Sequence, residues 1–240
     1  MNKVVEIAKM IDHSLLNPAL TDQELKEGCE EALFFHVASA CVKPCDVKQT
    51  AKYLQGSDVA VCGVIGFPHG NSTIEIKALE TEQIIRDGAV EVDMVVNIGK
   101  VLSEDWEYIE KEIQTITGIV KKHQALIKVI FENDLLPDDK FKIKLCEICS
   151  KNKVDFVKTS TGYNYVKGAD DKYSYKGATE HDLKLMRQYS APEVQVKAAG
   201  SVGNLEAILK AKDLGVTRVG TKGTRKIIED ARKRFGISDK

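Results

Sequence analysis

The sequence predicts a single α/β domain with the (β/α)8 TIM-barrel fold, and three observations support this. Short runs rich in β-branched residues recur along the whole chain, and each is followed by a longer segment of helical period. The runs are almost continuously apolar, as buried parallel strands are. Eight such pairs in 240 residues fit the barrel, for which about 250 residues are typical.

Each predicted strand is a short apolar run, and the helices between them begin at recognisable caps. The strands are expected at residues 11–16, 37–42, 59–65, 90–96, 126–131, 154–157, 194–198 and 216–219. Thr21 caps a helix over 25–35, and Glu24 completes a capping box. Further helices are expected over 74–86, from 103–105 to 120, and after 137–139, 179–180, 204 and 224.

The alternative architecture is a doubly wound open sheet. Such a sheet would place a glycine-rich nucleotide loop after its first strand, whereas the segment Ser14–Pro18 has no glycine. No linker, low-complexity tract or change in composition divides the chain. We therefore expect one domain over residues 1–240, with an insertion at about 163–176 after the sixth strand.

Charge and hydropathy exclude several classes of protein. The 35 Lys and Arg residues nearly balance the 36 Asp and Glu residues, which argues against nucleic-acid or membrane-surface binding. The longest apolar run, at about 59–67, is far shorter than the ~20 residues of a membrane span. The N-terminus has no apolar signal core, so a cytoplasmic location is expected.

The cysteines and histidines give no sign of a disulfide framework or of a metal site. Cys146 and Cys149 form a C-x-x-C pair, but they lie inside a predicted amphipathic helix and no second ligand pair is present. We expect both in the core. The histidines, at positions 13, 36, 69, 123 and 181, show no grouping with acids at strand ends, so no metal site is predicted.

Lysines inside apolar strands are unusual, and this chain has three of them. Lys158 ends the sixth strand, Lys197 lies in the seventh and Lys128 in the fifth. Corresponding places on adjacent strands would bring the amines of Lys158 and Lys197 together at the mouth of the barrel. Lys128 is expected to be structural or a helper.

Two buried amines side by side have a chemical use. Burial and a neighbouring cation both favour the neutral amine, and moving a lysine pKa from ~10.4 to near 7 takes roughly 4 kcal/mol. A neutral amine attacks carbonyl carbons and forms a Schiff base. The alternative is that each lysine extends to solvent or pairs with an acid such as Asp93; for two adjacent strands we favour the chemical interpretation.

Asp93 interrupts the buried fourth strand, and strand alternation places Glu91 on the same side. A buried carboxylate must be paired, and the strand lysines are the available cations. Asp93 is therefore expected to hold Lys197 protonated or to move a proton through water. A purely structural ion pair is the alternative.

Glycines follow the last three strands and predict an anion site. Thr161 and Gly162 follow the sixth strand, Gly200–Gly203 the seventh and Gly220–Gly223 the eighth. Barrels commonly bind phosphate with backbone N–H groups of the loops after strands seven and eight. Glycines also simply end strands, which is the structural alternative.

Six segments resemble one enzyme family, in order and across residues 4 to 235. They are Asp12–Leu16, Ala40–Pro44, Val64–Gly70, Glu91–Val95, Phe156–Gly162 and Val196–Gly200. The sequence is similar to the deoxyribose-phosphate aldolases, of which Lys-Thr-Ser-Thr-Gly and Glu-x-Asp-Met-Val are highly specific motifs. The resemblance implies a class I aldolase on a (β/α)8 barrel. Such an enzyme cleaves 2-deoxyribose 5-phosphate reversibly to acetaldehyde and glyceraldehyde 3-phosphate, without a metal or other cofactor.

The resemblance also implies roles for individual residues. Lys158 would form the Schiff base, Lys197 would be the second lysine that favours its neutral form, and Asp93 would relay protons with a bound water. Ser14 stands where members commonly have Thr, at the mouth. Cys41 matches a cysteine near the family's active site and receives no catalytic role.

Departures from the family pattern concern the far end of the substrate. Members usually have Gly-Ile-Arg where this chain has Ser201, Val202 and Gly203, and a serine pair where it has Lys222 and Gly223. These positions bind phosphate in the family, and Lys222 could supply a point charge instead. The expected phosphate contacts are Ser14, Thr161, Gly162, Gly200, Ser201, Gly220 and Lys222.

Three further questions stay open at this stage. The insertion at 163–176 carries four tyrosines and could be a lid, a subunit contact or a set of substrate contacts. A homo-oligomer, dimer or tetramer, is possible. The alternative functions are a related Schiff-base aldolase with another acceptor or donor and, much less favoured, a catalytically silent binding barrel or a metal-dependent isomerase.

Overall fold

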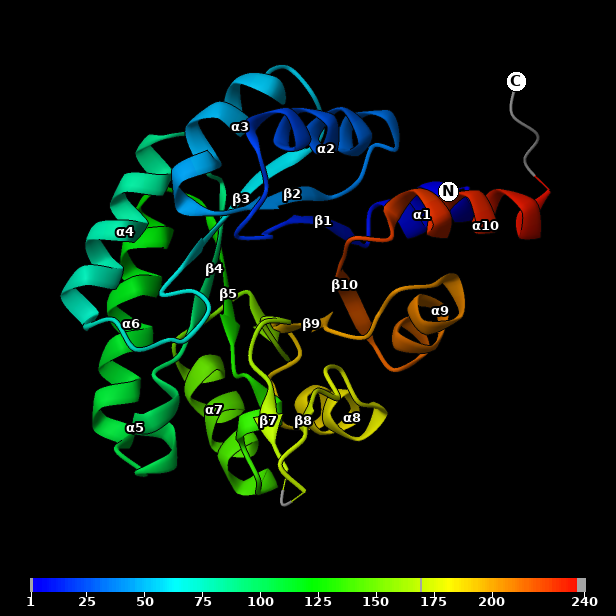
Figure 1. The fold of residues 1–240 in the computed structure, drawn as a ribbon. Helices are drawn as coiled ribbons and strands as arrows, with labels where there is room; N and C mark the ends of the chain where they lie inside the picture. Colours follow the sequence, from blue (N-terminus) through cyan, green and yellow to red (C-terminus); the bar gives the residue numbers. More distant parts are fainter. Residues whose placement is uncertain (1, 169, 237–240) are drawn as a thin grey trace.

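Eight parallel strands close into a barrel in the computed structural model, which describes residues 2–168 and 170–236 (Figure 1). Neighbours around the barrel follow the order β1-β10-β9-β6-β5-β4-β3-β2. The predicted fold class is confirmed. The strands are β1 (Ile11–Leu15), β2 (Ser39–Val42), β3 (Ala60–Ile65), β4 (Glu91–Val95), β5 (Leu126–Ile130), β6 (Phe156–Lys158), β9 (Gln195–Ala199) and β10 (Val216–Thr221).

Helices surround this barrel and connect successive strands (Figure 1). The principal ones are α2 (Asp22–Phe34), α3 (Val47–Tyr53), α4 (Ile74–Arg86), α6 (Trp106–Lys122), α7 (Asp139–Lys151), α8 (Glu180–Tyr189), α9 (Leu205–Asp213) and α10 (Thr224–Phe235). Shorter elements are α1 (Lys3–Ala8), α5 (Ile98–Leu102) and the 3-10 turns η1 (Pro44–Asp46) and η2 (Asn133–Leu135). We did not predict α3 or the shorter elements, because none of them is long enough to show a clear helical period.

The predicted helix caps are present with one exception. The Thr21 N–H donates to the Glu24 carboxylate at 2.8 Å, and the Glu24 N–H donates back to the Thr21 hydroxyl at 3.3 Å. Thr224 was expected before the last helix but is its first residue, and Gly223 is the N-cap. The Thr224 hydroxyl instead lies 2.7 Å from Nδ1 of His13 on β1, which explains why it does not cap the helix.

The segment after β6 forms a small antiparallel hairpin of β7 (Val166–Lys167) and β8 (Tyr173–Ser174). It lies outside the barrel next to α7 and α8 (Figure 1). Ala169, within the predicted insertion, lies outside the described residues. The hairpin returns the chain to the barrel at Tyr175, directly beside the end of β9.

Apolar side chains fill the space between the barrel and its helices. Cys146 and Cys149 are fully buried there with free thiols, so their predicted place in the core is confirmed. The inside of the barrel is different, because it holds charged side chains from several strands. In the part of the chain that the structure describes, no helix combines the length and apolar character needed to cross a bilayer.

One buried ion pair joins α4 to α6 outside the barrel. The Lys77 ammonium lies 2.6 Å from the Glu112 carboxylate and also donates to the carbonyls of Gly70 and Val95. Glu112 accepts the N–H of Asn97 at 3.0 Å. Burial lowers the pKa of Lys77 and raises that of Glu112, so each charge depends on the other.

We expect Lys77→Met to lower the free energy of unfolding by about 3–5 kcal/mol, because Glu112 is left as an unpaired buried charge. Urea unfolding followed by circular dichroism measures this directly. Lys111→Met is the matched control, since Lys111 is exposed on α6. Equal stability losses in the two variants would contradict the structural role of the pair.

Candidate active site

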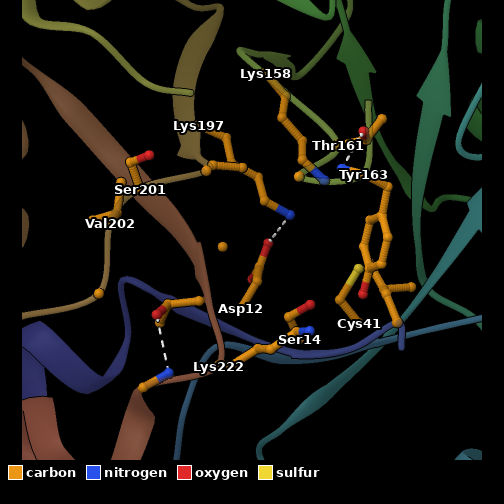
Figure 2. A pocket seen from close by; sticks show the side chains of 18 of the residues that line it. Asp12, Ser14, Cys41, Lys158, Thr161, Tyr163, Lys197, Ser201, Val202 and Lys222 are labelled. Carbon is orange, nitrogen blue, oxygen red and sulfur yellow. Dashed lines mark hydrogen bonds and ion pairs between the residues drawn. The ribbon is translucent and has the colours of Figure 1, made fainter. Parts of the chain in front are cut away.

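A cavity of about 490 Å³ opens at the carboxyl ends of the strands (Figure 2). This is the end of a (β/α)8 barrel where the catalytic loops converge. The residues that line it come from β1, β2, β6, β9 and β10 and from the loops that follow them. They are Asp12, Ser14, Leu16, Cys41, Lys158, Thr161, Gly162, Tyr163, Tyr175, Lys197, Ala199–Asn204 and Gly220–Gly223.

The two predicted lysines lie side by side in this cavity. Lys158 on β6 and Lys197 on β9 are direct partners across the parallel strands, so both side chains leave the barrel wall at the same level. Figure 2 shows the two amines directed into the same space. Each Nζ lies 2.7 Å from the same Oδ2 oxygen of Asp93 on β4.

Asp93 lies beneath the lysines and is completely buried. Its other oxygen, Oδ1, accepts a hydrogen bond from Lys128 of β5 at 2.8 Å and one from the Cys62 thiol at 3.2 Å. Burial alone would raise the pKa of Asp93, but the charges of Lys128, Lys158 and Lys197 outweigh it and hold the pKa well below its usual range. Asp93 is therefore ionised and reaches the cavity only through the lysines.

Further charges continue the cluster towards β1 and β10. The Asp12 carboxylate lies 2.5 Å from the amine of Lys197 and 2.5 Å from the guanidinium of Arg218. The Glu91 carboxylate lies 2.6 Å from the amine of Lys128 and 3.1 Å from Arg218. The carboxylates of Asp12 and Asp93 outweigh the effect of burial on Lys197 and raise its pKa, so Lys197 stays protonated. At Lys128, the negative charges around it, with Asp93 the largest contribution, likewise outweigh the effect of burial and raise the pKa.

Lys158 is the least neutralised cation of this cluster. Four cationic side chains face three carboxylates, and the other three cations each contact two or three of them. Lys158 has an ion pair with Asp93 alone. Its amine faces the cavity beside the ammonium of Lys197.

The structure brings the other predicted site residues to the same cavity. Nine of the ten residues named from the sequence line it, and the tenth, Asp93, supports it from below. Those that line it are Lys158, Lys197, Ser14, Thr161, Gly162, Gly200, Ser201, Gly220 and Lys222. Lys222 projects from the loop after β10, with Nζ 5.5 Å from the centre of the Tyr163 ring.

Sequence reasoning missed Asp12, Tyr163, Tyr175 and Asn204. Asp12 is an acid inside an apolar strand, the same signal that identified Asp93, and could have been found by it. Tyr163 and Tyr175 frame the insertion, whose path could not be predicted. Asn204 caps α9 through its side chain, so its cap was predicted but its place at the cavity was not.

A hydrogen-bonded network fixes the loop after β6. Glu132, in the left-handed backbone region at φ 59°, accepts the Thr161 N–H at 3.1 Å and also the Thr161 hydroxyl. It accepts a further bond from the Asn164 amide at 2.7 Å, and Asn164 lies 2.9 Å from His69 Nδ1. The loops after β3, β5 and β6 are thereby joined, which sets the position of Thr161 at the cavity.

Two helix N-termini border the opposite side of the cavity. α9 begins after Asn204 and α10 after Gly223, and the preceding loops Gly200–Gly203 and Gly220–Gly223 line the cavity. Helix N-termini with glycine-rich loops attract anions through their N–H groups. Gly223 brings no capping side chain to α10. This side can accept a negatively charged group.

Two groups of side chains have the composition of metal ligands, within the described residues. Cys41, Cys62 and Asp93 form one, and Asp139, His181 and Asp182 form the other. Lysines already contact both: Lys128 is 3.2 Å from the Cys62 sulfur, and Lys142 lies 2.8 Å from Asp139 and 2.6 Å from Asp182. A cation placed there would face an ammonium group, so neither group is suited to a metal ion.

Comparison with known proteins gives this site a family. The family model described as DeoC/LacD family aldolase matches residues 6–224. The chain belongs to this family of aldolases. A curated deoxyribose-phosphate aldolase of Rhodopirellula baltica is 47% identical over 232 residues, which are 97% of this chain and 92% of the relative. Another, from Clostridium perfringens strain 13, is 44% identical over 93% of this chain and 95% of the relative.

Solved structures agree with this assignment. The chain is similar to a structure described as QR15, an aldolase, with a TM-score of 0.87, 30% identity and coverage of 98% of this chain and 99% of that one. A tetrameric deoxyribose phosphate aldolase from Aeropyrum pernix has a TM-score of 0.85 and 27% identity, covering 96% of this chain and 93% of that one. In this aldolase, the residues that depart from the family pattern lie on the anion-facing side of the cavity.

Proposed function

We propose that this aldolase cleaves 2-deoxyribose 5-phosphate reversibly to acetaldehyde and glyceraldehyde 3-phosphate through a Schiff base on Lys158. The observation that carries the proposal is the pair of amines on one buried carboxylate, with the less neutralised amine open to the cavity. A neutral lysine beside a fixed ammonium is a nucleophile towards carbonyls. The names of the relatives support the choice of substrate.

The chemistry follows from the positions of the three groups. The Lys158 nitrogen attacks the carbonyl carbon of acetaldehyde, and loss of water leaves a protonated imine. The imine draws electrons from the adjacent methyl group, which loses a proton to give an enamine. The enamine carbon attacks the second aldehyde, whose oxygen takes up a proton, and water then releases Lys158.

Proton transfer is assigned to the groups beside Lys158. Lys197 and Asp12 both line the cavity and lie 2.5 Å apart, so they can exchange protons with substrate directly or through a water. Asp93 supports this step by holding both lysines in place. Its predicted role as the relay thus becomes an indirect one in this proposal, exercised through Lys158 and Lys197.

The phosphate is assigned to the loops Gly200–Gly203 and Gly220–Gly223. Their backbone N–H groups and the N-termini of α9 and α10 supply the donors, and Lys222 supplies a charge. Ser14, on β1 next to the end of β10, contributes a hydroxyl. This assignment allows the chain to do without the arginine and the serine pair that the family usually has.

Borohydride trapping tests the proposal. We expect intact-mass and peptide analysis to find a reduced adduct on Lys158 after treatment with borohydride plus acetaldehyde, and also after borohydride plus 2-deoxyribose 5-phosphate. Labelling by acetaldehyde alone would favour an aldolase with a different acceptor, because the altered loops would then reject the phosphate. Absence of any adduct would contradict the Schiff-base mechanism.

Two further proposals concern the state of the protein in the cell. We propose a homo-oligomer, supported by the tetramer that the Aeropyrum pernix structure describes, and mass photometry tests it. A cytoplasmic location is supported by the free thiols of all six cysteines, which suit a reducing compartment.

A further inference from the structure

The hairpin after β6 returns to the barrel at a point that touches the cavity. Lys176 and Gly177 donate their N–H groups to the two carboxylate oxygens of Asp134, each at 2.8 Å. The Ala178 N–H donates to the Gly200 carbonyl at 3.1 Å. The segment 175–178 is thus held between the loop after β5 and the loop after β9.

Tyr175, at the start of this segment, sits against Gly200, which directly follows β9, and its hydroxyl is near Gly162 in the loop after β6. A methyl group added at Gly200 would lie 1.9 Å from the Tyr175 hydroxyl oxygen, and one added at Gly162 would lie 3.8 Å from it. Only a glycine at position 200 leaves room for the hydroxyl. The ring therefore separates the loop after β6 from the loop after β9 and forms part of the cavity wall.

The Tyr175 hydroxyl is buried at the wall of the cavity beside the Ser160 hydroxyl, with which it interacts. The end of the ring lies directly against Gly200, so the shape of the side chain contributes to its position as well as its hydroxyl. The ring is therefore placed to act on the loop that it contacts.

The loop that Tyr175 contacts has a backbone that needs support. Gly200 and Ser201 have φ values of 82° and 61°, both in the left-handed region, which a serine rarely adopts. Ser201 itself is exposed. The same loop leads into Asn204 and the N-terminus of α9, on the side of the cavity that faces an anion. A change in this loop would alter the spacing of the N–H groups there.

We propose that Tyr175 determines specificity: by holding the loop Gly200–Gly203 in place, it sets the preference of this aldolase for an acceptor aldehyde with an anionic end. The inference rests on the proposed function, since it concerns the same cavity. On this inference, the hairpin contributes to substrate selection, while the Schiff-base chemistry is carried out by side chains on the strands. Tyr175 acts here through the loop and is a positioning residue.

The test compares Tyr175→Ala with Tyr175→Phe and with Tyr173→Ala. Tyr173 is the matched control, because it lies on the same hairpin and is exposed. For Tyr175→Ala we expect KM for 2-deoxyribose 5-phosphate to rise about tenfold while kcat changes less than about threefold, since loose positioning weakens binding of the far end. Cleavage of unphosphorylated 2-deoxyribose should be unchanged, and the Phe and control variants should match the wild type.

A binding measurement separates this inference from the proposed function. Calorimetry with glycerol 3-phosphate, which has no aldehyde, should show about tenfold weaker binding to Tyr175→Ala than to the wild type. This result would support the inference even if the wild type failed to cleave 2-deoxyribose 5-phosphate, a failure that would count against the proposed function alone. Equal binding by both proteins, or an equal loss of activity on phosphorylated and unphosphorylated sugars, would overturn the inference.

Discussion

Lys158→Met is expected to lower aldol cleavage by about 10⁴-fold or more, because the substituted side chain has no nitrogen to bond with the carbonyl carbon. The protein should nevertheless fold. Removal of the Lys158 amine leaves three cations facing three carboxylates in the cluster. Asp93 keeps its contacts with Lys128 and Lys197. Steady-state cleavage of 2-deoxyribose 5-phosphate measures the loss, and urea unfolding measures the stability.

Lys144→Met is the control for this substitution. Lys144 lies on α7, outside the cavity, where it pairs with Glu147. This variant should retain full activity and form the borohydride adduct at Lys158. Unchanged turnover in Lys158→Met would show that the reaction does not pass through this lysine, whatever the stability of the variant.

Asp93→Asn is expected to damage both activity and stability. The substitution removes the only charge that three lysines share, so the buried cluster gains a second uncompensated positive charge. Loss of one partner from such a cluster costs about 3–5 kcal/mol of unfolding free energy. Activity should fall about 10³-fold, since neither Lys158 nor Lys197 keeps its orientation. Urea unfolding and steady-state kinetics measure the two effects.

A double variant separates misfolding from loss of function. Asp93→Asn with Lys128→Met removes one charge of each sign, and removing both members of a buried pair is often neutral for stability. We expect the double variant to unfold close to the wild type and to stay as inactive as Asp93→Asn. Recovery of turnover along with stability would show that Asp93 is needed only for folding.

The pH dependence of unfolding gives a further check on Asp93. Its folded-state pKa lies below the ordinary carboxylate value of about 3.9, so its ionised form stabilises the native state at and above that pH. This contribution is lost as the pH falls below about 4, towards the lower pKa of the folded state. The wild type should therefore lose stability in acid more steeply than Asp93→Asn, and parallel curves would argue against the shift.

The barrel could be predicted because its strands carry a signal that tertiary packing does not change. Most of these runs are buried on both faces, so their apolar character is visible without knowledge of the neighbouring strands. The ends of β6 and β9 were uncertain by a residue or two, since hydrogen bonding across the barrel decides them. The short α5 and the hairpin escaped prediction because their positions depend on contacts rather than on periodicity.

The same distinction holds at the site. Lys158, Lys197 and Asp93 could be proposed from the sequence because charged groups stand out in apolar strands, and the structure brings the three side chains into contact. The partners of each charge could not be predicted in the same way. Lys128 forms an ion pair with Asp93, and Arg218 forms one with Asp12. These pairs depend on which side chains meet across the interior of the barrel. Tyr175 could not have been found, since its contact with Gly200 depends on the path of the hairpin.

The division between strands and loops in this barrel has a consequence for its redesign. The amines and their carboxylates are fixed on strands, whereas the hairpin and the loops after β9 and β10 surround the far end of the cavity. Grafting the hairpin onto a relative without it, or shortening it in this chain, would change which aldehydes are accepted. The lysines and carboxylates on the strands would stay intact. Libraries aimed at new acceptors should therefore vary residues 163–176 and 200–203 together and leave the interior of the barrel untouched.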